Sequence, residues 1–276
     1  MAVKVKISPL ELREEIKKNR EISPVRIILT TPELSAKLAL EAFEKDGRHP
    51  YVVSNFTISE GFLREKEDGV KSYGPTQLKI ALHAETIKYI DIVLPKHGYG
   101  YKKREASEDA LALKEMIEKA IGKRAIKVSA KVENMEIDYS KFDIVIYQCV
   151  DYRFFLENVS NLILEKGMIP LVISSAGAVA ILKDRVNPDM KKSIKDQIIR
   201  AFKLSGAKLF LILNHGNQCG GYKNCGCSGA EALSDVAIVK EMATKILKDG
   251  GFYGVQVVSR YQTLDAYYSV EFRDIT

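Results

Sequence analysis

Short apolar runs alternate with longer amphipathic stretches along most of this sequence, and this alternation limits the folds open to the chain. The apolar runs that we predict to be buried strands are residues 25–30, 51–56, 90–94, 143–148, 168–174, 208–213, 255–259 and 266–272. The stretches that we predict to be helices are residues 32–46, 75–89, 108–121, 154–166, 190–205 and 229–249. Alternating strands and helices form a parallel sheet with right-handed crossovers, so the predicted fold class is α/β.

The length of the chain and one change in pattern predict two domains. The 276 residues exceed a typical single domain. Residues 124–137 begin with strand-like alternation and end in mixed polar residues, so we place a boundary at about residue 138. We therefore expect two α/β units, residues 1–138 of unknown role and residues 139–276.

Composition excludes several classes of protein. A hydrophobic content of 46% with 28% charged residues is that of a globular chain. The 42 basic and 36 acidic residues are well mixed, which argues against nucleic acid as a partner despite the net charge of +6. No apolar run approaches the roughly 18 residues of a membrane-spanning helix, and the first residues do not resemble a secretion signal. We expect a cytoplasmic protein that does not bind membranes.

Two helix starts carry clear signals. Ser228 and Glu231 have the spacing of a capping box before the predicted helix 229–249. Thr31 is a suitable N-cap residue, with Pro32 at the first helical position.

Residues that can bind a metal follow two of the predicted strands. Cys149, Asp151 and Arg153 come directly after the strand 143–148, and His215 and Cys219 follow the strand 208–213. All four cysteines of the chain lie in this second half, and clustered cysteines in a cytosolic protein favour metal binding or catalysis over disulfides. Two thiolates and an imidazole form a catalytic zinc pattern whose fourth position is open to water.

A zinc ion held by these ligands needs help to ionise its water. Two thiolates cancel the charge of the ion, so such a zinc is a weaker Lewis acid than one held by three imidazoles. A carboxylate beside the water, held by a guanidinium group, supplies that help. On an extended backbone Cys149, Asp151 and Arg153 would point to one side, so we predict that Asp151 and Arg153 form this dyad.

These motifs resemble those of the β-class carbonic anhydrases. The resemblance rests on Cys149-Val150-Asp151-Tyr152-Arg153, on Ala176-Gly177-Ala178, and on His215 followed by Cys219-Gly220. It covers about residues 140–276 and does not extend to residues 1–138. It implies a parallel-sheet domain with Cys149, His215 and Cys219 as zinc ligands and Asp151 and Arg153 as the catalytic dyad.

The resemblance also implies a reaction and an assembly. The reaction is the zinc-dependent hydration of carbon dioxide to bicarbonate with zinc hydroxide as nucleophile, and the assembly is a homodimer or a higher homo-oligomer. We expect Gly177 to contribute to the substrate site. Backbone N–H groups near Gly220 and Gly221 are candidates for binding the developing anion.

The sequence departs from the family pattern at two places. Three residues separate His215 from Cys219 where the family has two, and Ala178 stands where the family has asparagine. A bulge beside glycine could absorb the additional residue. Two alternatives therefore stay open: hydrolysis of another small linear molecule, such as carbonyl sulfide or carbon disulfide, and a non-catalytic zinc-binding sensor or scaffold.

Three further stretches receive plainer interpretations. Cys225-Gly226-Cys227 is interpreted as a loop, with a separate thiolate site or a redox disulfide as alternatives. Residues 95–101 and the pair Thr30-Thr31, a possible anion site, are expected to have a structural or oligomerising role. His49 and His83 are expected at the surface or on a helix face.

Overall fold

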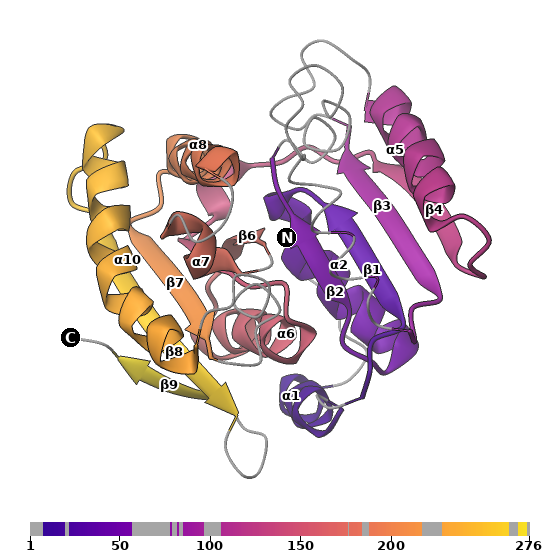
Figure 1. The fold of residues 1–276 in the computed structure, drawn as a ribbon, viewed down its shortest axis with the longest axis horizontal. Coiled ribbons are helices and arrows are strands. Elements are labelled where there is room, and N and C mark those ends of the chain that lie inside the picture. Colours follow the sequence, from indigo (N-terminus) through magenta and orange to yellow (C-terminus); the bar gives the residue numbers. More distant parts are fainter. Residues whose placement is uncertain are drawn as a thin grey trace. The chain divides into compact units, whose positions relative to one another are not determined.

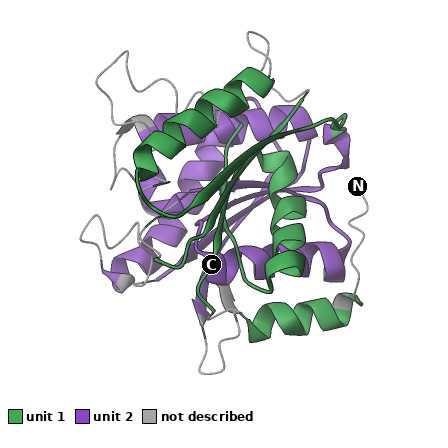
Figure 2. Cartoon of the chain, turned by 90° about the vertical axis from the view of Figure 1, so that its right-hand side faces the viewer, with its two compact units in different colours: residues 1–138 green, residues 139–276 purple. Residues whose placement is uncertain are grey.

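A computed structural model of the chain describes two compact units, Met1–Asp138 and Tyr139–Thr276 (Figures 1 and 2). The residues it describes are 8–19, 22–56, 78, 82, 85–96, 106–175, 177–183, 188–216, 228–264 and 270–274. Both units combine a mainly parallel sheet with helices, which confirms the predicted α/β class.

Unit 1 contains a parallel sheet of four strands in the order β4-β3-β1-β2. The strands are β1 (Arg26–Thr30), β2 (Tyr51–Ser54), β3 (Tyr89–Pro95) and β4 (Lys127–Glu133). The helices are α1 (Pro9–Lys18), α2 (Pro32–Asp46) and α5 (Ala106–Ile121). Every residue of β1 is buried, as its apolar sequence predicts for a central strand of a parallel sheet. The predicted helix 75–89 lies largely outside the described residues, and Tyr89 belongs to β3.

In unit 1 the prediction that Thr31 is an N-cap residue is confirmed, and the prediction that His49 lies at the surface or on a helix face is wrong. Thr31 is the N-cap residue of α2 and Pro32 follows it as predicted, but the Thr31 side chain makes no capping hydrogen bond. His49 is fully buried and not at the surface: its Nε2 lies 2.7 Å from the Ile16 carbonyl oxygen, and its ring packs edge-on against Phe43. The His49 contact attaches α1 to this unit, which its position in the sequence does not reveal.

A buried ionic network lies near the amino ends of the strands of unit 1. Arg26 donates from Nε to Asp46 Oδ2 at 2.6 Å and from Nη2 to Asp46 Oδ1 at 3.1 Å. Its Nη1 donates to Asp91, which also accepts a 2.6 Å hydrogen bond from the Ser129 hydroxyl. Burial disfavours the charged guanidinium, but the two carboxylates outweigh this effect and raise the pKa of Arg26. The network links β1, α2, β3 and β4.

Unit 2 has five strands in the order β6-β5-β7-β8-β9. They are β5 (Ile144–Gln148), β6 (Pro170–Ser174), β7 (Leu209–His215), β8 (Gln256–Leu264) and β9 (Val270–Asp274). The first four in this spatial order are parallel, and β9 is antiparallel to β8. The main helices are α6 (Tyr152–Ser160), α7 (Ala178–Leu182), α8 (Pro188–Ser205) and α10 (Gly229–Asp249). Two short segments complete the unit, the 3-10 turn Tyr139–Lys141 and a π-helical segment Asn161–Glu165 that continues α6.

The long helices of unit 2 bury the apolar faces that the sequence predicts. On α8, Ile194, Ile198, Ala201 and Phe202 are buried, and on α10, Val236, Val239, Ala243 and Ile246 are buried. The capping box of α10 is present, with Ser228 accepting from the Glu231 backbone and Glu231 accepting from the Ser228 backbone. None of the helices in the described ranges is long and apolar enough to cross a membrane.

The strands of the two units follow one topology. Numbered along the chain within each unit, the four parallel strands have the spatial order 2-1-3-4 in both. The chain therefore leaves the first strand towards one edge of this set of four, where the second strand lies, and leaves the third strand towards the opposite edge, where the fourth strand lies. Open α/β sheets bind ligands at such a switch point, beyond the carboxyl ends of the strands. In unit 1 this point lies between β1 and β3, and in unit 2 it lies between β5 and β7.

Candidate active site

The candidate site begins where β5 and β7 end side by side in unit 2. These strands pair in parallel from Ile144 opposite Leu209 to Gln148 opposite Leu213. Cys149 follows β5 directly and is buried. His215 is the last residue of β7, where it pairs with Gln262 of β8, and does not follow the strand as predicted. The sheet therefore brings the predicted ligands Cys149 and His215 to neighbouring strand ends.

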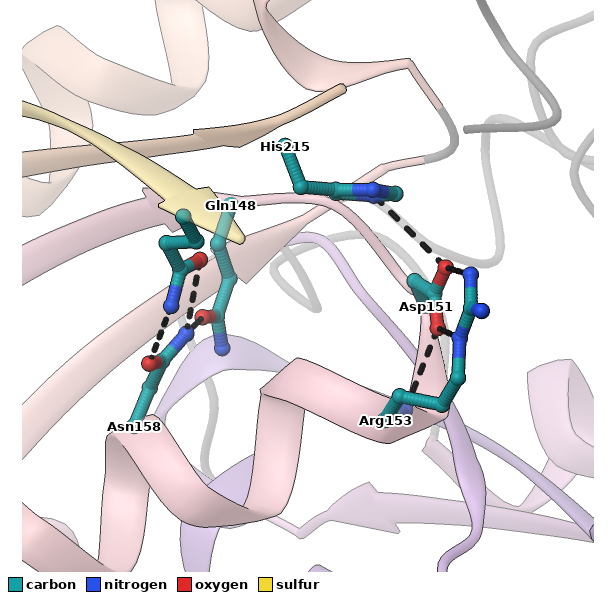
Figure 3. Close-up of polar contacts among 6 residues, drawn as sticks. Gln148, Asp151, Arg153, Asn158 and His215 are labelled. Atoms are coloured by element: carbon teal, nitrogen blue, oxygen red, sulfur yellow. Dashed lines mark hydrogen bonds and ion pairs between the residues drawn. The ribbon is translucent and has the colours of Figure 1, made fainter. Parts of the chain in front are cut away.

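Asp151 and Arg153 form a paired dyad at the start of α6 (Figure 3). The guanidinium group donates from Nε to Asp151 Oδ1 at 3.0 Å and from Nη2 to Asp151 Oδ2 at 2.7 Å. Asp151 is also the N-cap residue, because its Oδ1 accepts from the Arg153 backbone N–H at 3.1 Å. The predicted extended arrangement of Cys149, Asp151 and Arg153 is wrong, since Arg153 lies in the first turn of the helix. The pairing itself is present, and a helix start produces it.

His215 faces this dyad from β7. Its Nε2 lies 3.7 Å from Asp151 Oδ2, which is within ion-pair range but too long for a hydrogen bond (Figure 3). The imidazole stacks on the ring of Phe154, with centroids 4.6 Å apart and an interplanar angle of 29°. The side chain of His215 is 2% exposed, and those of Asp151 and Arg153 are 11% and 14% exposed. The three polar groups are thus held in a largely desolvated environment.

The electrostatic surroundings keep Asp151 ionised. Burial is the largest influence on its pKa and acts to raise it. The hydrogen bonds from Arg153 and the nearby charges of His215 and Arg153 act in the opposite direction, and together they hold the pKa of Asp151 below its ordinary value. At neutral pH the carboxyl group is therefore a hydrogen-bond acceptor with a strong preference for its charged form.

The predicted metal ligands are described only in part. Within the described ranges, no group of three His, Cys, Asp or Glu side chains could hold a metal ion. The third predicted ligand, Cys219, lies outside those ranges, as do Gly220, Gly221, Cys225 and Cys227. The chemistry of the described donors fits zinc, which accepts imidazole nitrogen and thiolate sulfur.

The loop after β6 is fixed to β5 by a tyrosine. Tyr147 is buried and its hydroxyl donates to the Ala178 carbonyl oxygen at 2.6 Å, while the Ser175 hydroxyl donates to Tyr147 at 3.1 Å. Gly177 has a φ of 70°, a left-handed conformation that glycine adopts without strain. The predicted substrate role of Gly177 stays a prediction, and its conformation provides a structural reason for the glycine.

Sequence reasoning missed a network of buried amides beside His215. Asn158 of α6 donates to the Gln148 side chain at 2.6 Å and to the Gln262 side chain at 3.2 Å. Gln262 donates back to Asn158 at 2.6 Å, and all three residues are buried. A sequence signal existed for Gln148, because it ends a strand that is otherwise apolar and buried, and a buried amide needs a partner.

A close contact at Gly216 was also missed. Gly216 follows His215, and a Cβ at this position would lie 2.0 Å from the Tyr261 hydroxyl oxygen and 3.2 Å from Tyr261 Cζ. Tyr261 is the β8 partner of Asn214, so its hydroxyl reaches the backbone just beyond the end of β7. Only glycine fits here without displacing Tyr261.

The fold and this site define an α/β protein whose candidate site lies at the topological switch point of a parallel sheet. Neither a protein-family model nor a curated protein matches the sequence. Among solved structures, "Complex structure of VinN with L-aspartate" is similar over 95% of this chain and 70% of that chain, with 12% identity and a TM-score of 0.31. At this identity and TM-score, the similarity indicates nothing about the function of the present chain.

Proposed function

We propose that unit 2 is a zinc-dependent enzyme that hydrates carbon dioxide to bicarbonate. The observation that carries the proposal is the ionised Asp151–Arg153 pair, which faces His215 beyond the adjoining ends of β5 and β7. A carboxylate clamped in this way is more than a helix cap, because both of its oxygens are fixed by the guanidinium group next to a buried imidazole. The Cys-x-Asp-x-Arg motif, which resembles that of the β-class carbonic anhydrases, also supports the proposal.

The proposed ligands are Cys149, His215 and Cys219. Zinc held by one imidazole and two thiolates keeps a fourth position for water and makes that water nucleophilic. The stack of Phe154 on the His215 ring restricts the orientation of the imidazole.

Asp151 and Arg153 have separate tasks in this proposal. Asp151 would accept a hydrogen bond from a zinc-bound water, which would orient the water and favour release of its proton to solvent. Its lowered pKa means that it acts mainly as an acceptor and holds no proton of its own at neutral pH. Arg153 keeps both carboxylate oxygens in place, with Nε on one and Nη2 on the other. Backbone N–H groups near Gly177, Gly220 and Gly221 are proposed to bind the anionic product.

Metal analysis combined with a carbon dioxide hydration assay tests the proposal. We expect about one zinc per chain and hydration that falls about 100-fold or more in Asp151→Ala while zinc is retained. Asp46→Ala is the matched control, because it removes a carboxylate from the Arg26 pair of the other unit and should leave hydration by the folded protein unchanged. Protein that binds zinc but does not hydrate carbon dioxide would contradict the enzyme, and protein without zinc would contradict the metal centre.

The proposal includes an assembly that follows from the resemblance and a location that we expect from the amino-acid sequence. We propose a homodimer or higher homo-oligomer in the cytoplasm. Sedimentation equilibrium at several protein concentrations tests the assembly, and a monomer at micromolar concentration would contradict it.

A further inference from the structure

The amide network of Gln148, Asn158 and Gln262 lies beside the candidate site, and the proposed chemistry gives it no task. It joins three elements, because Gln148 ends β5, Asn158 lies on α6 and Gln262 lies on β8. His215 is the β7 partner of Gln262, and Leu213, two residues earlier, is the β7 partner of Gln148. Residues opposite each other in neighbouring strands share a face of the sheet, so the two glutamines flank His215 on one face.

Asn158 uses its whole amide in this network. Its Nδ2 group donates to Gln148 at 2.6 Å and to Gln262 at 3.2 Å, and its Oδ1 accepts from Gln262 at 2.6 Å. The exposed fractions of Gln148, Asn158 and Gln262 are 1%, 2% and 1%. Asn158 and Gln262 satisfy each other reciprocally, whereas Gln148 accepts from Asn158 and its Nε2 has no hydrogen-bond partner among the described residues. A reciprocal pair of buried amides fixes the relative position of its side chains more narrowly than apolar contacts do.

The same side of α6 contacts His215. Phe154 and Asn158 are four residues apart, so they lie on one face of the helix, and Phe154 stacks on the His215 ring. Asp151 and Arg153 lie at the start of this helix. A helix of nine residues depends on tertiary contacts for its orientation, and Phe154 and Asn158 provide them towards the strands.

We infer that Asn158 is a positioning residue. Its amide fixes the rotation of α6 about the helix axis and the position of α6 along the strands, and thereby holds the Asp151–Arg153 pair against His215. This inference rests on the proposed function where it concerns turnover. Its geometric part concerns only described residues. Because the network is neutral, it orients the dyad without adding a charge beside it.

The test separates positioning from stability by replacing the network with apolar groups. Asn158→Leu leaves the Gln148 and Gln262 amides without their partner, so it should destabilise the fold. The triple variant Gln148→Met, Asn158→Leu and Gln262→Met removes all three amides together, and its stability in urea should largely recover. Ser160→Ala is the matched control on the same helix, because the buried Ser160 hydroxyl donates only within α6, to the Glu157 carbonyl oxygen.

The decisive measurement is solvent exchange of the Arg153 Nε–H proton by NMR, assigned by comparison with Arg153→Lys. This proton is bonded to Asp151 and reports the dyad whether or not zinc is bound. We expect exchange to be about tenfold faster in Asn158→Leu and in the triple variant, and unchanged in Ser160→Ala. Hydration by the zinc-loaded triple variant should fall about tenfold or more despite its recovered stability.

The outcomes distinguish this inference from the proposed function. Wild-type exchange and wild-type hydration in a stable triple variant would overturn the inference and leave the enzyme intact. Loss of hydration in every protein, wild type included, contradicts the proposed function, and faster exchange in Asn158→Leu would still support the positioning role. If the triple variant does not fold, Gln262→Met removes one partner of Asn158 and is measured in the same way, with unchanged exchange as the contradicting result.

Discussion

Both units contain an arginine that is paired with aspartate. The pair of unit 1 lies near the amino ends of its strands, whereas the pair of unit 2 lies beyond the carboxyl end of β5. Arg26 is the first residue of β1, and its partners Asp46 and Asp91 belong to α2 and β3. Arg153 and Asp151 lie beyond the end of β5, within two residues of each other in sequence. The first pair joins distant segments, so its role is to hold the fold. The second pair connects two residues at the start of one helix and does not hold distant segments together, so we look for its role in the candidate site.

The switch points of the two units differ in the chemistry of their residues. In unit 2, Cys149, Asp151 and His215 gather at the ends of β5 and β7. In unit 1, β1 ends at Thr30, whose hydroxyl donates to the Val93 carbonyl oxygen at 2.7 Å, and Thr31 follows as the N-cap residue of α2. A shared topology therefore does not make a shared site, since the described residues at the end of β1 differ in their chemistry from those at the ends of β5 and β7.

The largest expected effect is on stability and separates the two arginines. Arg26→Met leaves Asp46 and Asp91 without their counter-charge, and we expect a loss of about 3–5 kcal/mol in the free energy of unfolding. Arg153→Met should cost about 1–2 kcal/mol, because it leaves one carboxylate without its counter-charge where Arg26→Met leaves two, and because Asp151 keeps its hydrogen bond from the backbone N–H of residue 153. Urea denaturation measures both. Equal losses in the free energy of unfolding would show that the two pairs contribute equally to the stability of the fold.

The next effect concerns the backbone after His215. Gly216→Ala would place a methyl group 2.0 Å from the Tyr261 hydroxyl oxygen, so we expect a loss of about 1–3 kcal/mol and weaker zinc binding. Tyr261→Phe removes that oxygen, and the nearest atom is then Cζ at 3.2 Å. The double variant should regain most of the stability and zinc binding, as measured by denaturation and zinc titration. Failure of Tyr261→Phe to improve Gly216→Ala would show that this contact is not the reason for the glycine.

A smaller effect should depend on pH. The pKa of Asp151 is lowered in the folded protein, so its ionisation stabilises the fold above its ordinary pKa of about 3.9, and this stabilisation is lost as pH falls through the lowered folded value. Asp151→Asn should therefore be less stable than the wild type at pH 7, by about 1–2 kcal/mol, with a difference that shrinks below about pH 4. Denaturation at a series of pH values measures it. A difference that grows on acidification would contradict the lowered pKa.

The smallest effects compare one helix cap from each unit. Ser228→Ala removes the hydroxyl that accepts from the Glu231 backbone, and we expect a loss of about 1 kcal/mol. Thr31→Val removes a buried hydroxyl that has no hydrogen-bond partner in the described part of the chain, so the change should be neutral or slightly stabilising. Thermal denaturation of both variants provides the comparison. A loss in Thr31→Val as large as that in Ser228→Ala would indicate a cap that the structure lacks.

Much of the fold could be predicted from local pattern. The apolar runs predicted β1, β5 and β7, because a strand buried on both faces needs an uninterrupted apolar sequence. The spacing of Ser228 and Glu231 predicted the start of α10, because a capping box involves only residues within one turn. Less local features were predicted less well: His49 is buried by α1, and the sequence around His49 contains no trace of that contact.

The sequence by itself determined the local elements of the candidate site, namely the strand before Cys149, the strand that carries His215, and a motif in which Asp151 can reach Arg153. Only the tertiary structure decided that β7 lies next to β5 and that Asn158 joins Gln148 to Gln262. The physical reason is the range of the interactions. Caps and periodicity act over a few residues, whereas strand order and buried amide networks also depend on residues far apart in the sequence, such as Asn158 and Gln262, whose separation is 104 residues.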